Sequence, residues 1–481
     1  MKCDAQHAGE IELKFSLDGR AAGKIARHRL LADHDRQSRS QRSVYFDTTD
    51  ATLRTKGYSL RVRQVGDGFT QTLKTRASQA GLFSRGEWEM PVAAMAPDLT
   101  ALAQTPLKGL RRIGGDLVSV VQCDVERTIW LVDHLDSAIE VVLDSGVVSA
   151  SGKELAFHEL ELELKQGTPA AIFSFARMLL ESVPLRLGVV SKQERGEMLA
   201  LGLGAPHKAS PLLFDDGMTV EQVFGQILIS TVRHFRLNES AVIAQSDHEA
   251  LHQARVAMRR LRGALTLFRP AIRQAGLERL RDELRWLTSS LADARDLDVF
   301  VAEHDDLARA DRKKLRSAQR AAYDEVGAAI DSQRLRNLLL DLVEWLSIGK
   351  WQKSAASAPI AKFANQRLDA LWKKVSHLAS DLANLDDERL HRLRIHAKKL
   401  RYAVEFLASL YGKDARKFTS RLEQIQDGLG RMNDEVTGRQ LIARLSLHAD
   451  AEIMFAGSRP EQIRDLQKHF KALRKVGRFW A

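Results

Sequence analysis

The sequence has few cysteines and no long apolar run, and both absences limit where the protein can work. Only two cysteines, Cys3 and Cys123, occur among its 481 residues, which is too few for a disulfide framework and typical of a reducing compartment. No segment approaches the ~18 consecutive apolar residues of a membrane helix. The N-terminus carries Asp4 and Glu10 without an apolar stretch, unlike a secretory signal. We therefore predict a cytoplasmic protein without a membrane partner.

Common catalytic motifs are also absent. The chain has no GxxxxGK[ST] loop, which argues against a P-loop enzyme. Neither cysteine lies in a sequence setting that would activate a nucleophile. The histidines of the first 200 residues show no metal-ligand spacing and are expected at the surface or in the core; they are His7, His28, His34, His134 and His158.

Positive charge is concentrated in the second part of the chain. The net charge is +11, from 73 Lys and Arg against 62 Asp and Glu. Residues 1–210 hold 27 cationic and 26 acidic residues, so 46 and 36 remain for residues 211–481. An excess of cations on one domain indicates a polyanion partner, which nucleic acid, an anionic membrane surface or inorganic polyphosphate would satisfy.

The character of the sequence changes near residue 210. The segment 201–216 contains Gly, Pro and Ser without a clear period and marks a candidate boundary. Before it, short alternating runs predict many strands; after it, Leu-, Ala- and Arg-rich segments with a 3.6-residue period predict helices. We expect a domain over 1–205, a linker over 206–217 and an all-α domain over 218–481. The expected strands are 10–17, 42–47, 58–65, 69–76, 86–92, 124–132, 138–144, 147–150 and 156–165, and the expected helices of the first domain are 20–32, 98–105, 169–182 and 194–200.

The helical half contains an internal repeat. The run from His252 to Ala264 matches the run from His391 to Ala403, and Leu291–Asp296 downstream matches Leu429–Asp434. Each unit is too long for a solenoid repeat. Two similar helical bundles related by pseudo-symmetry are therefore the expected architecture.

Each copy of the repeat places a line of cations on one helix face, beside an apolar face that must be buried. A solvated face would explain one such stripe, but two copies, which we expect to lack acidic i,i+4 partners, favour anion binding. Zinc ligation by His248 and His252 is a weaker alternative, because neighbouring arginines oppose a cation. The two basic stripes are His248, His252, Arg255, Arg259 and Arg262 in the first copy and His391, Arg394, Lys398 and Arg401 in the second.

Phosphate is the anion that fits these stripes best. The arginine fork binds phosphate through two hydrogen bonds of fixed geometry, and histidine adds a donor below pH ~6.5. Base readout or stacking needs aromatic side chains between the cations, and the stripes lack them apart from Tyr402. Polyphosphate therefore ranks above nucleic acid, and no sequence-specific nucleic-acid partner is expected.

A second charged pattern has the period of a β-strand. In the run from Glu10 to Phe15 every second residue is charged, so the charges share one face of a strand, and the pattern returns at 61–63, 72–74 and 159–164. Surface salt bridges would explain any single pair, but together the runs predict a charged face that encloses a metal ion and a polyanion. Candidate carboxylates are Glu10, Glu12, Glu87, Glu89, Glu140, Asp144, Glu159, Glu161 and Glu163, and candidate phosphate clamps are Lys14, Arg61, Arg63, Lys74, Arg85, Arg127 and Lys192.

At these residues the sequence resembles two known families. The ExExK start at Glu10–Lys14, YFDT at Tyr45–Thr48, GYSLRVR at Gly57–Arg63, LELELK at Leu160–Lys165 and SKQERG at Ser191–Gly196 resemble the CYTH domain of triphosphate tunnel metalloenzymes over roughly 8–205. The repeat resembles the CHAD domain over roughly 218–480. One departure from strict repetition is His396, whose place in the first copy is taken by Ala257.

The resemblance implies an α+β domain with a closed eight-stranded antiparallel tunnel, followed by two four-helix bundles with a polyphosphate-binding basic groove. It implies Mg²⁺ or Mn²⁺ as cofactor. The implied metal ligands are Glu10, Glu12, Asp144, Glu159 and Glu161, to which the strand pattern adds Glu163. The implied catalytic residues are Glu10, Glu12, Lys14, Asp144 and Lys192. Substrate would be held by Lys14, Arg61, Arg63, Lys74, Arg127 and Lys192, to which the charge pattern adds Arg85.

Three functions fit these expectations. The leading hypothesis is metal-dependent hydrolysis of inorganic triphosphate to pyrophosphate and phosphate, with polyphosphate held by the helical domain. A second is a tunnel enzyme for an organic triphosphate, as an adenylate cyclase or a thiamine triphosphatase, with Trp88 or Trp130 available to stack on a ring. A third is a non-catalytic, granule-associated protein in which both domains bind polyphosphate.

Overall fold

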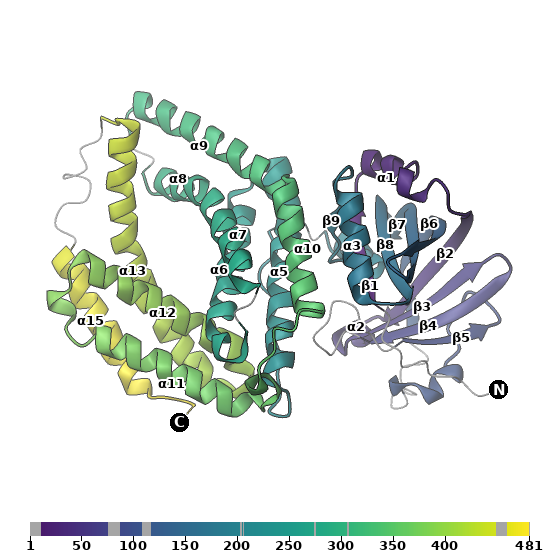
Figure 1. Ribbon diagram of the computed structural model, residues 1–481. Coiled ribbons are helices and arrows are strands. Elements are labelled where there is room, and N and C mark those ends of the chain that lie inside the picture. Colours follow the sequence, from purple (N-terminus) through teal and green to yellow (C-terminus); the bar gives the residue numbers. More distant parts are fainter. Residues whose placement is uncertain are drawn as a thin grey trace. The chain divides into compact units, whose positions relative to one another are not determined.

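The computed structural model describes residues 11–75, 87–107, 117–202, 204, 206–273, 276–304, 307–448 and 459–480. Contacts divide the chain into a β unit, Met1–Ala205 with Gln333–Gly349, and a helical unit, Pro206–Ser332 with Lys350–Ala481 (Figure 1). Helix α10 (Gln333–Ser347) thus belongs to the β unit, where it packs on α3 (Pro169–Leu180). Arg177 of α3 pairs there with Asp341, at 2.6 Å, and with Glu344. The domain limits expected from the sequence stay a prediction.

The β unit is built on one antiparallel sheet in the order β5-β4-β3-β2-β6-β7-β8-β1-β9. The expected closure by eight strands is wrong in detail, since the described strands number nine and the outer strands, β5 and β9, each pair on one side only. Pro91 in β5, which has no N–H to donate, suits an edge strand, and β9 has only two residues. The strands are β1 (Glu12–Leu17), β2 (Arg36–Thr48), β3 (Tyr58–Val65), β4 (Gly68–Thr75), β5 (Glu87–Val92), β6 (Leu117–His134), β7 (Ser137–Ala150), β8 (Lys153–Gln166) and β9 (Arg186–Leu187).

The outer face of the sheet carries two apolar layers, because alternate side chains of each strand point to it. Helices α1 (Gly19–Ile25) and α3 pack against β1, β7 and β8, where Phe15, Leu160 and Leu162 are buried. On the other half of the sheet, α2 (Thr52–Thr55) and the 3₁₀ turn η2 (Ala101–Gln104) contribute to a core with strands β2 to β5. That core consists of Phe46, Leu53, Leu60, Val62, Leu73, Met90, Leu102 and Leu107.

The inner face has an apolar end and a charged end. Helix α4 (Lys192–Ala200) packs on β6, β7 and β8 over Tyr45, Val121, Cys123, Val148 and Phe157. A capping box starts the helix: Ser191 accepts from the backbone N–H of Glu194, and the Glu194 carboxylate accepts from that of Ser191. This start places Lys192, the first residue of α4, at the edge of the charged end.

The helical unit contains two groups of packed helices that follow the repeat. The first group packs α5 with α6 and α9, and the second packs α12 with α11 and α13. Between the groups α6 crosses α12 closely, where a Cβ on Gly263 would lie 3.3 Å from the Tyr402 ring. The helices are α5 (Val220–Gln245), α6 (His248–Leu267), α7 (Leu277–Ser290), α8 (Ala292–Glu303), α9 (Arg309–Ile330), α11 (Ile360–Leu378), α12 (Asp387–Leu407), α13 (Lys413–Leu445) and α15 (Arg459–Val476).

Within the described ranges, no helix is both long enough and apolar enough to cross a bilayer.

Candidate functional site

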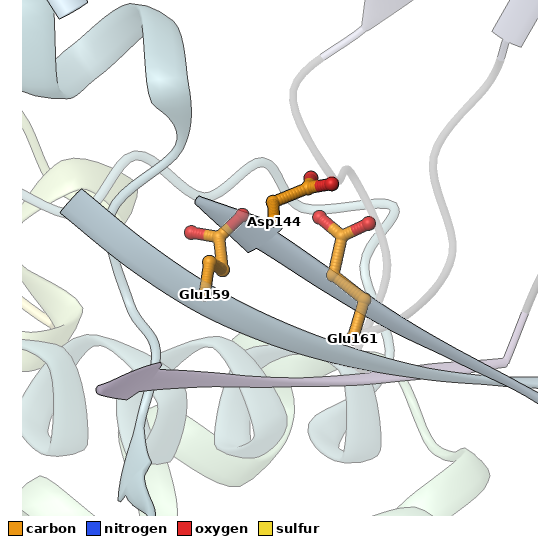
Figure 2. A group of neighbouring side chains, drawn as sticks. All are labelled: Asp144, Glu159 and Glu161. Atoms are coloured by element: carbon orange, nitrogen blue, oxygen red, sulfur yellow. The ribbon is translucent and has the colours of Figure 1, made fainter. Parts of the chain in front are cut away.

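Three carboxylates meet at the charged end of the inner face. Asp144 of β7 lies opposite Glu159 of β8 in the strand register, and Glu161 follows Glu159 on the same face. One oxygen from each of the three lies within 4.8 Å of the others, and Figure 2 shows the three carboxylates turned toward one another. Asp144 and Glu159 are fully buried. Buried carboxylates this close repel one another unless cations accompany them.

Three of the predicted cations surround the carboxylates. Lys192 reaches Glu159 at 2.5 Å, Asp144 at 3.0 Å and Glu161 at 3.1 Å. The Lys14 ammonium lies 2.8 Å from Glu161. The Arg127 guanidinium donates two hydrogen bonds to Asp144, at 2.8 and 2.7 Å, and a third to Glu161 at 3.2 Å. These contacts join β1, β6, β7, β8 and α4 in one network.

The network keeps both kinds of group ionised. Burial raises the pKa of Glu161, but Lys14, Lys192 and Arg127 outweigh it and hold that pKa well below its usual range. Burial also raises the pKa of Asp144, but Lys192 and Arg127 outweigh this effect, so that pKa is lowered overall. In return the carboxylates raise the pKa of Lys192 and of Lys14, against the effect of burial. At neutral pH the site therefore offers ionised oxygen ligands.

The carboxylate group fits a hard divalent cation. The donor set consists of oxygens alone, which Mg²⁺ and Mn²⁺ prefer. The Oε2 atom of Glu159 is buried and accepts no hydrogen bond from the described residues. The Arg195 guanidinium forms an ion pair with this oxygen at 3.5 Å. A buried carboxylate oxygen without a hydrogen bond is costly, and a metal ion would supply the close contact that it lacks.

The opposite wall of the site is lined by cations from β3 and β4. Lys74 binds Glu87 at 2.6 Å, and Arg61 lies 3.8 Å from both Glu87 and Glu89. Arg63 differs from them, because within the described chain it forms no ion pair and only a long 3.5 Å hydrogen bond to Ser43. Burial and the nearby cations Arg61 and Arg127 lower the pKa of Arg63 to about 10. Among the described residues of this wall, Arg63 is thus the cation with the weakest polar contacts.

The predicted site residues of the β unit fall into three groups. The structure brings Lys14, Arg127, Asp144, Glu159, Glu161 and Lys192 together. Glu12 lies beside them, 3.5 Å from Lys14, whereas Glu163 is 2.7 Å from Lys165 and outside the three-carboxylate group. Glu10 and Arg85 lie outside the described residues, so their roles stay predictions.

The two basic stripes converge where α6 passes α12. Burial and the neighbours Arg394 and Arg259 lower the pKa of Lys398 to about 7, so cations of both copies share one field. Arg255 donates to the Leu291 carbonyl at 2.5 Å, and Arg394 donates to Asn433 at 2.7 Å. The second repeated motif thus braces the first in both copies. Neither Arg259 nor Lys398 forms an ion pair with any described carboxylate.

Two expectations about the stripes need correction. The predicted absence of acidic i,i+4 partners is wrong at Arg401, which pairs with Glu405 at 3.3 Å. His248 lies 2.7 Å from the buried Asp298, which also accepts from Tyr323 at 2.9 Å. Glu405 and Asp298 thus lie at the ends of the stripes, because Arg401 is the last residue of the second stripe and His248 the first residue of the first. In the middle of the stripes Arg255 also pairs with Asp296, at 3.7 Å, whereas Arg259 and Lys398 form no ion pair with a described carboxylate.

Comparison with known protein families agrees with both halves of this architecture. Residues 8–196 match the family model of the CYTH domain, and residues 226–443 match that of the CHAD domain. The chain is a CYTH–CHAD protein. The three carboxylates and their cations lie in its CYTH domain, and the two basic stripes lie in its CHAD domain.

Relatives align with one or both domains. An inorganic triphosphatase of Haemophilus influenzae is 30% identical over 198 residues, which are 40% of this chain and 54% of that protein. The aligned part thus spans about half of that relative. An uncharacterized protein of Mycobacterium tuberculosis is 28% identical over 449 residues, 85% of this chain and 82% of its own. The crystal structure of the CHAD domain from the plant Ricinus communis covers 57% of this chain and 92% of its own, at 30% identity and a TM-score of 0.45.

Sequence reasoning missed two polar residues of the CYTH site. Arg195 of α4 lies 3.5 Å from Glu159; its position three residues after Lys192, on the same helix face, was the available signal. Gln41 of β2 is 93% buried, and neither amide atom has a described hydrogen-bond partner. No charge pattern marks Gln41, because a neutral residue between serines and arginines resembles an exposed strand.

Proposed function

We propose that the CYTH domain hydrolyses inorganic triphosphate to pyrophosphate and phosphate with Mg²⁺ or Mn²⁺, and that the CHAD domain binds polyphosphate. The observation that carries the enzymatic part is the group of Asp144, Glu159 and Glu161 within 4.8 Å, on the same inner face as Arg63, which forms no ion pair within the described chain. The carboxylates suit a metal ion, and Arg63 suits a phosphate. A metal–phosphate complex would satisfy both walls together.

The three carboxylates would hold the metal ion, which supplies positive charge that neutralises phosphate oxygens and activates water. Arg61, Arg63 and Lys74 on the opposite wall bind and orient the chain of phosphates. Lys14 and Arg127, which already balance the carboxylates, stabilise negative charge that moves onto the leaving pyrophosphate.

Water attack on the terminal phosphorus breaks the bond from that phosphorus to the bridging oxygen. Glu12 is the candidate acceptor of the water proton, since its carboxylate lies 3.5 Å from Lys14 but outside the three-carboxylate group. Its side chain is about one-third exposed, so it can exchange the proton with solvent. The products are pyrophosphate and phosphate, and no covalent enzyme intermediate is required.

An inorganic substrate is favoured over an organic triphosphate by the positions of the two tryptophans that were candidates to stack on a ring. Trp88 packs against the outer core beside Leu73, and Trp130 is buried on the face of β6 opposite to Arg127. Neither ring borders the charged face, so neither is placed to stack on adenine or thiamine. The candidates for substrate recognition are cations, which bind phosphate and no particular ring.

A substrate profile tests the enzymatic proposal. Phosphate release is measured from tripolyphosphate, ATP and thiamine triphosphate, with Mg²⁺, with Mn²⁺ and with EDTA. Preference for tripolyphosphate together with loss of activity in EDTA is the expected result. Equal or faster turnover of an organic triphosphate would assign the site to that substrate, and no turnover of any of them would leave a binding protein.

The CHAD proposal is tested by the salt dependence of polyphosphate binding. Replacing Arg259 and Lys398 together by Gln removes two unpaired cations, and each lost phosphate contact lowers the slope of log affinity against log salt by about 0.7. Arg389 is the matched control, since it is exposed on the same helix and pairs with Asp386. An unchanged slope in the double variant would refute the assignment.

A further inference from the structure

A second group of cations surrounds a cavity in the helical unit, outside the two basic stripes. The cavity has a volume of about 530 Å³ and is lined by Arg269, Pro270, Lys353, Arg367 and Lys374. Of the described residues that line it, four are cationic and none is acidic. No stripe residue contributes. Four like charges around one cavity repel one another unless an anion accompanies them.

The walls of this cavity are held by backbone contacts. Arg269 and Pro270 belong to the 3₁₀ turn η4 (Arg269–Ala271) that follows α6, and Lys353 donates its backbone N–H to Ala271 at 3.1 Å. Arg367 and Lys374 share one face of α11, at i and i+7. Arg367 donates its Nε–H to the Leu267 carbonyl at the end of α6, at 2.8 Å. That bond fixes the guanidinium while its terminal nitrogens remain available.

The repeat does not generate this cavity. When α5 is aligned with α11, the buried residues of the two helices correspond: Val220, Phe224 and Leu228 match Ile360, Ala364 and Leu368. In the same alignment the places of Arg367 and Lys374 are taken by Ile227 and His234, both buried. The cation pair therefore exists in one half of the CHAD domain and is not part of the repeated stripes.

We propose that this cavity is a second anion site, which binds a compact multiply phosphorylated anion independently of the stripes. Two arginines offer paired donors to phosphate oxygens, and two lysines add compact charges. The pocket is open to solvent, since Arg269, Lys353 and Lys374 are exposed, and its limited volume suits a short anion better than a long polymer. Inorganic tripolyphosphate, whose negative charge matches four cations, is the probe.

Residue-resolved lysine acetylation of the full chain tests the proposal. In EDTA, which prevents hydrolysis, tripolyphosphate should protect Lys353 and Lys374 beyond the effect of NaCl at the same ionic strength. Lys373, an exposed neighbour on α11 that does not line the cavity, is the internal control. Arg367→Leu should raise the half-protecting concentration about ten-fold, as expected for loss of a charge-assisted hydrogen bond, while Lys362→Gln, which alters charge elsewhere on α11, should not.

Two results would overturn the second anion site. One is protection of Lys353 and Lys374 no greater than in NaCl. The other is loss of that protection in the Arg259→Gln, Lys398→Gln double variant, which would make the cavity an extension of the stripes. Protection that persists in the double variant and is lost in Arg367→Leu supports the proposal.

A different observation in the CYTH domain carries a second inference, which rests on the proposed function. Gln41 pairs with Val65 of β3 and Val125 of β6, so it stands diagonally between Arg63 and Arg127 on the inner face. Gln41 lies on the same face of β2 as Ser43, which contacts Arg63, and as Tyr45, which packs in the inner core. A buried amide without partners destabilises the protein, and this one lies beside two of the phosphate-binding cations.

We infer that Gln41 is a positioning residue, whose amide N–H donates to a non-bridging phosphate oxygen held between Arg63 and Arg127. A neutral donor adds direction without adding a further charge to a crowded set of cations. Removing the amide should then weaken the substrate complex and relieve the empty protein of an unsatisfied polar group.

Gln41→Leu is the informative change. Ligand-free Gln41→Leu should unfold at the wild-type temperature or above it, whereas its KM for tripolyphosphate should rise about ten-fold. Gln37→Leu, at an exposed position of the same strand, should change neither. A lower unfolding temperature with unchanged KM would make Gln41 merely structural. Wild-type protein that neither binds nor hydrolyses tripolyphosphate would overturn the proposed function and this inference together.

Discussion

Glu12 on β1 and Lys74 on β4 act on each other across the inner face, although five strands separate β1 from β4 in the sheet. Burial and Arg61 lower the pKa of Lys74, and the carboxylates of Glu87 and Glu12 partly restore it. The two ends of the sheet must therefore curl toward one another. This curl sets the carboxylates of β7 and β8 against the cations of β3 and β4, and the proposed chemistry depends on that opposition.

Asp144→Asn should remove most of the metal-dependent turnover, by at least ~10²-fold, since loss even of a group that only supports metal ligands costs 10–100-fold. The amide keeps the volume but loses the charge that Arg127 and Lys192 balance. Turnover is measured as phosphate release from tripolyphosphate against Mg²⁺ concentration. Asp124→Asn, on the same sheet in an exposed pair with Arg42, should stay near wild type; full activity of Asp144→Asn would remove this residue from the site.

Lys192→Met should move the acid limb of the pH–rate profile to higher pH. Lys192 helps to lower the pKa of Asp144 and of Glu161, so without it these carboxyls take up protons at higher pH and lose the metal there. The measurement is kcat/KM between pH 5 and 9 at fixed Mg²⁺. Lys192→Arg keeps the charge and should leave the acid limb in place, even where it lowers kcat. An acid limb that does not move in Lys192→Met would contradict the electrostatic account.

Gly196→Ala should weaken both stability and activity. A Cβ at this position would overlap the Val121 side chain and lie 2.9 Å from Val148, which forces α4 away from the sheet and withdraws Lys192 from the carboxylates. Overpacking of this kind costs about 1–3 kcal/mol, measured by denaturant unfolding beside kcat. Gly327→Ala, on α9 with no atom within 4 Å of the added carbon, should stabilise by up to ~1 kcal/mol. Two variants of equal stability and activity would contradict this packing argument.

Polyphosphate binding by the CHAD domain should take up a proton near neutral pH. Lys398 has a pKa of about 7 because burial and then Arg394, Arg259 and Arg401 oppose its charge, while Asp434 supports it. A bound anion raises that pKa, so affinity should fall as the pH rises above about 7. Calorimetry in buffers of different ionisation enthalpy measures the proton uptake. Lys398→Arg should abolish the uptake and retain binding; uptake that persists in this variant would assign the proton to another group.

The residues of the CYTH site were largely readable from the sequence, and their partners were not. Strand parity put Glu159 and Glu161 on one face of their strand and Asp144 with Glu140 on one face of another, because the β period is two. It could not show that Arg127 pairs with Asp144, since this pairing depends on the register between β6 and β7, nor that Glu163 pairs with Lys165 of its own strand and stays outside the three-carboxylate group. The inclusion of α10 in the β unit has no local sequence signal, whereas Pro91 is one for the edge at β5.

The amino-acid sequence by itself determined the strand faces, the helical repeat and the types of charge that each carries, because these follow from local periodicity. Only the tertiary structure decided which charges are neutralised and which are left for a ligand. That distinction arises from burial and from contacts between strands and helices far apart in the chain. It separates Arg63, Gln41, Arg259 and Lys398 from neighbours of similar chemistry, and it revealed the cavity between η4 and α11.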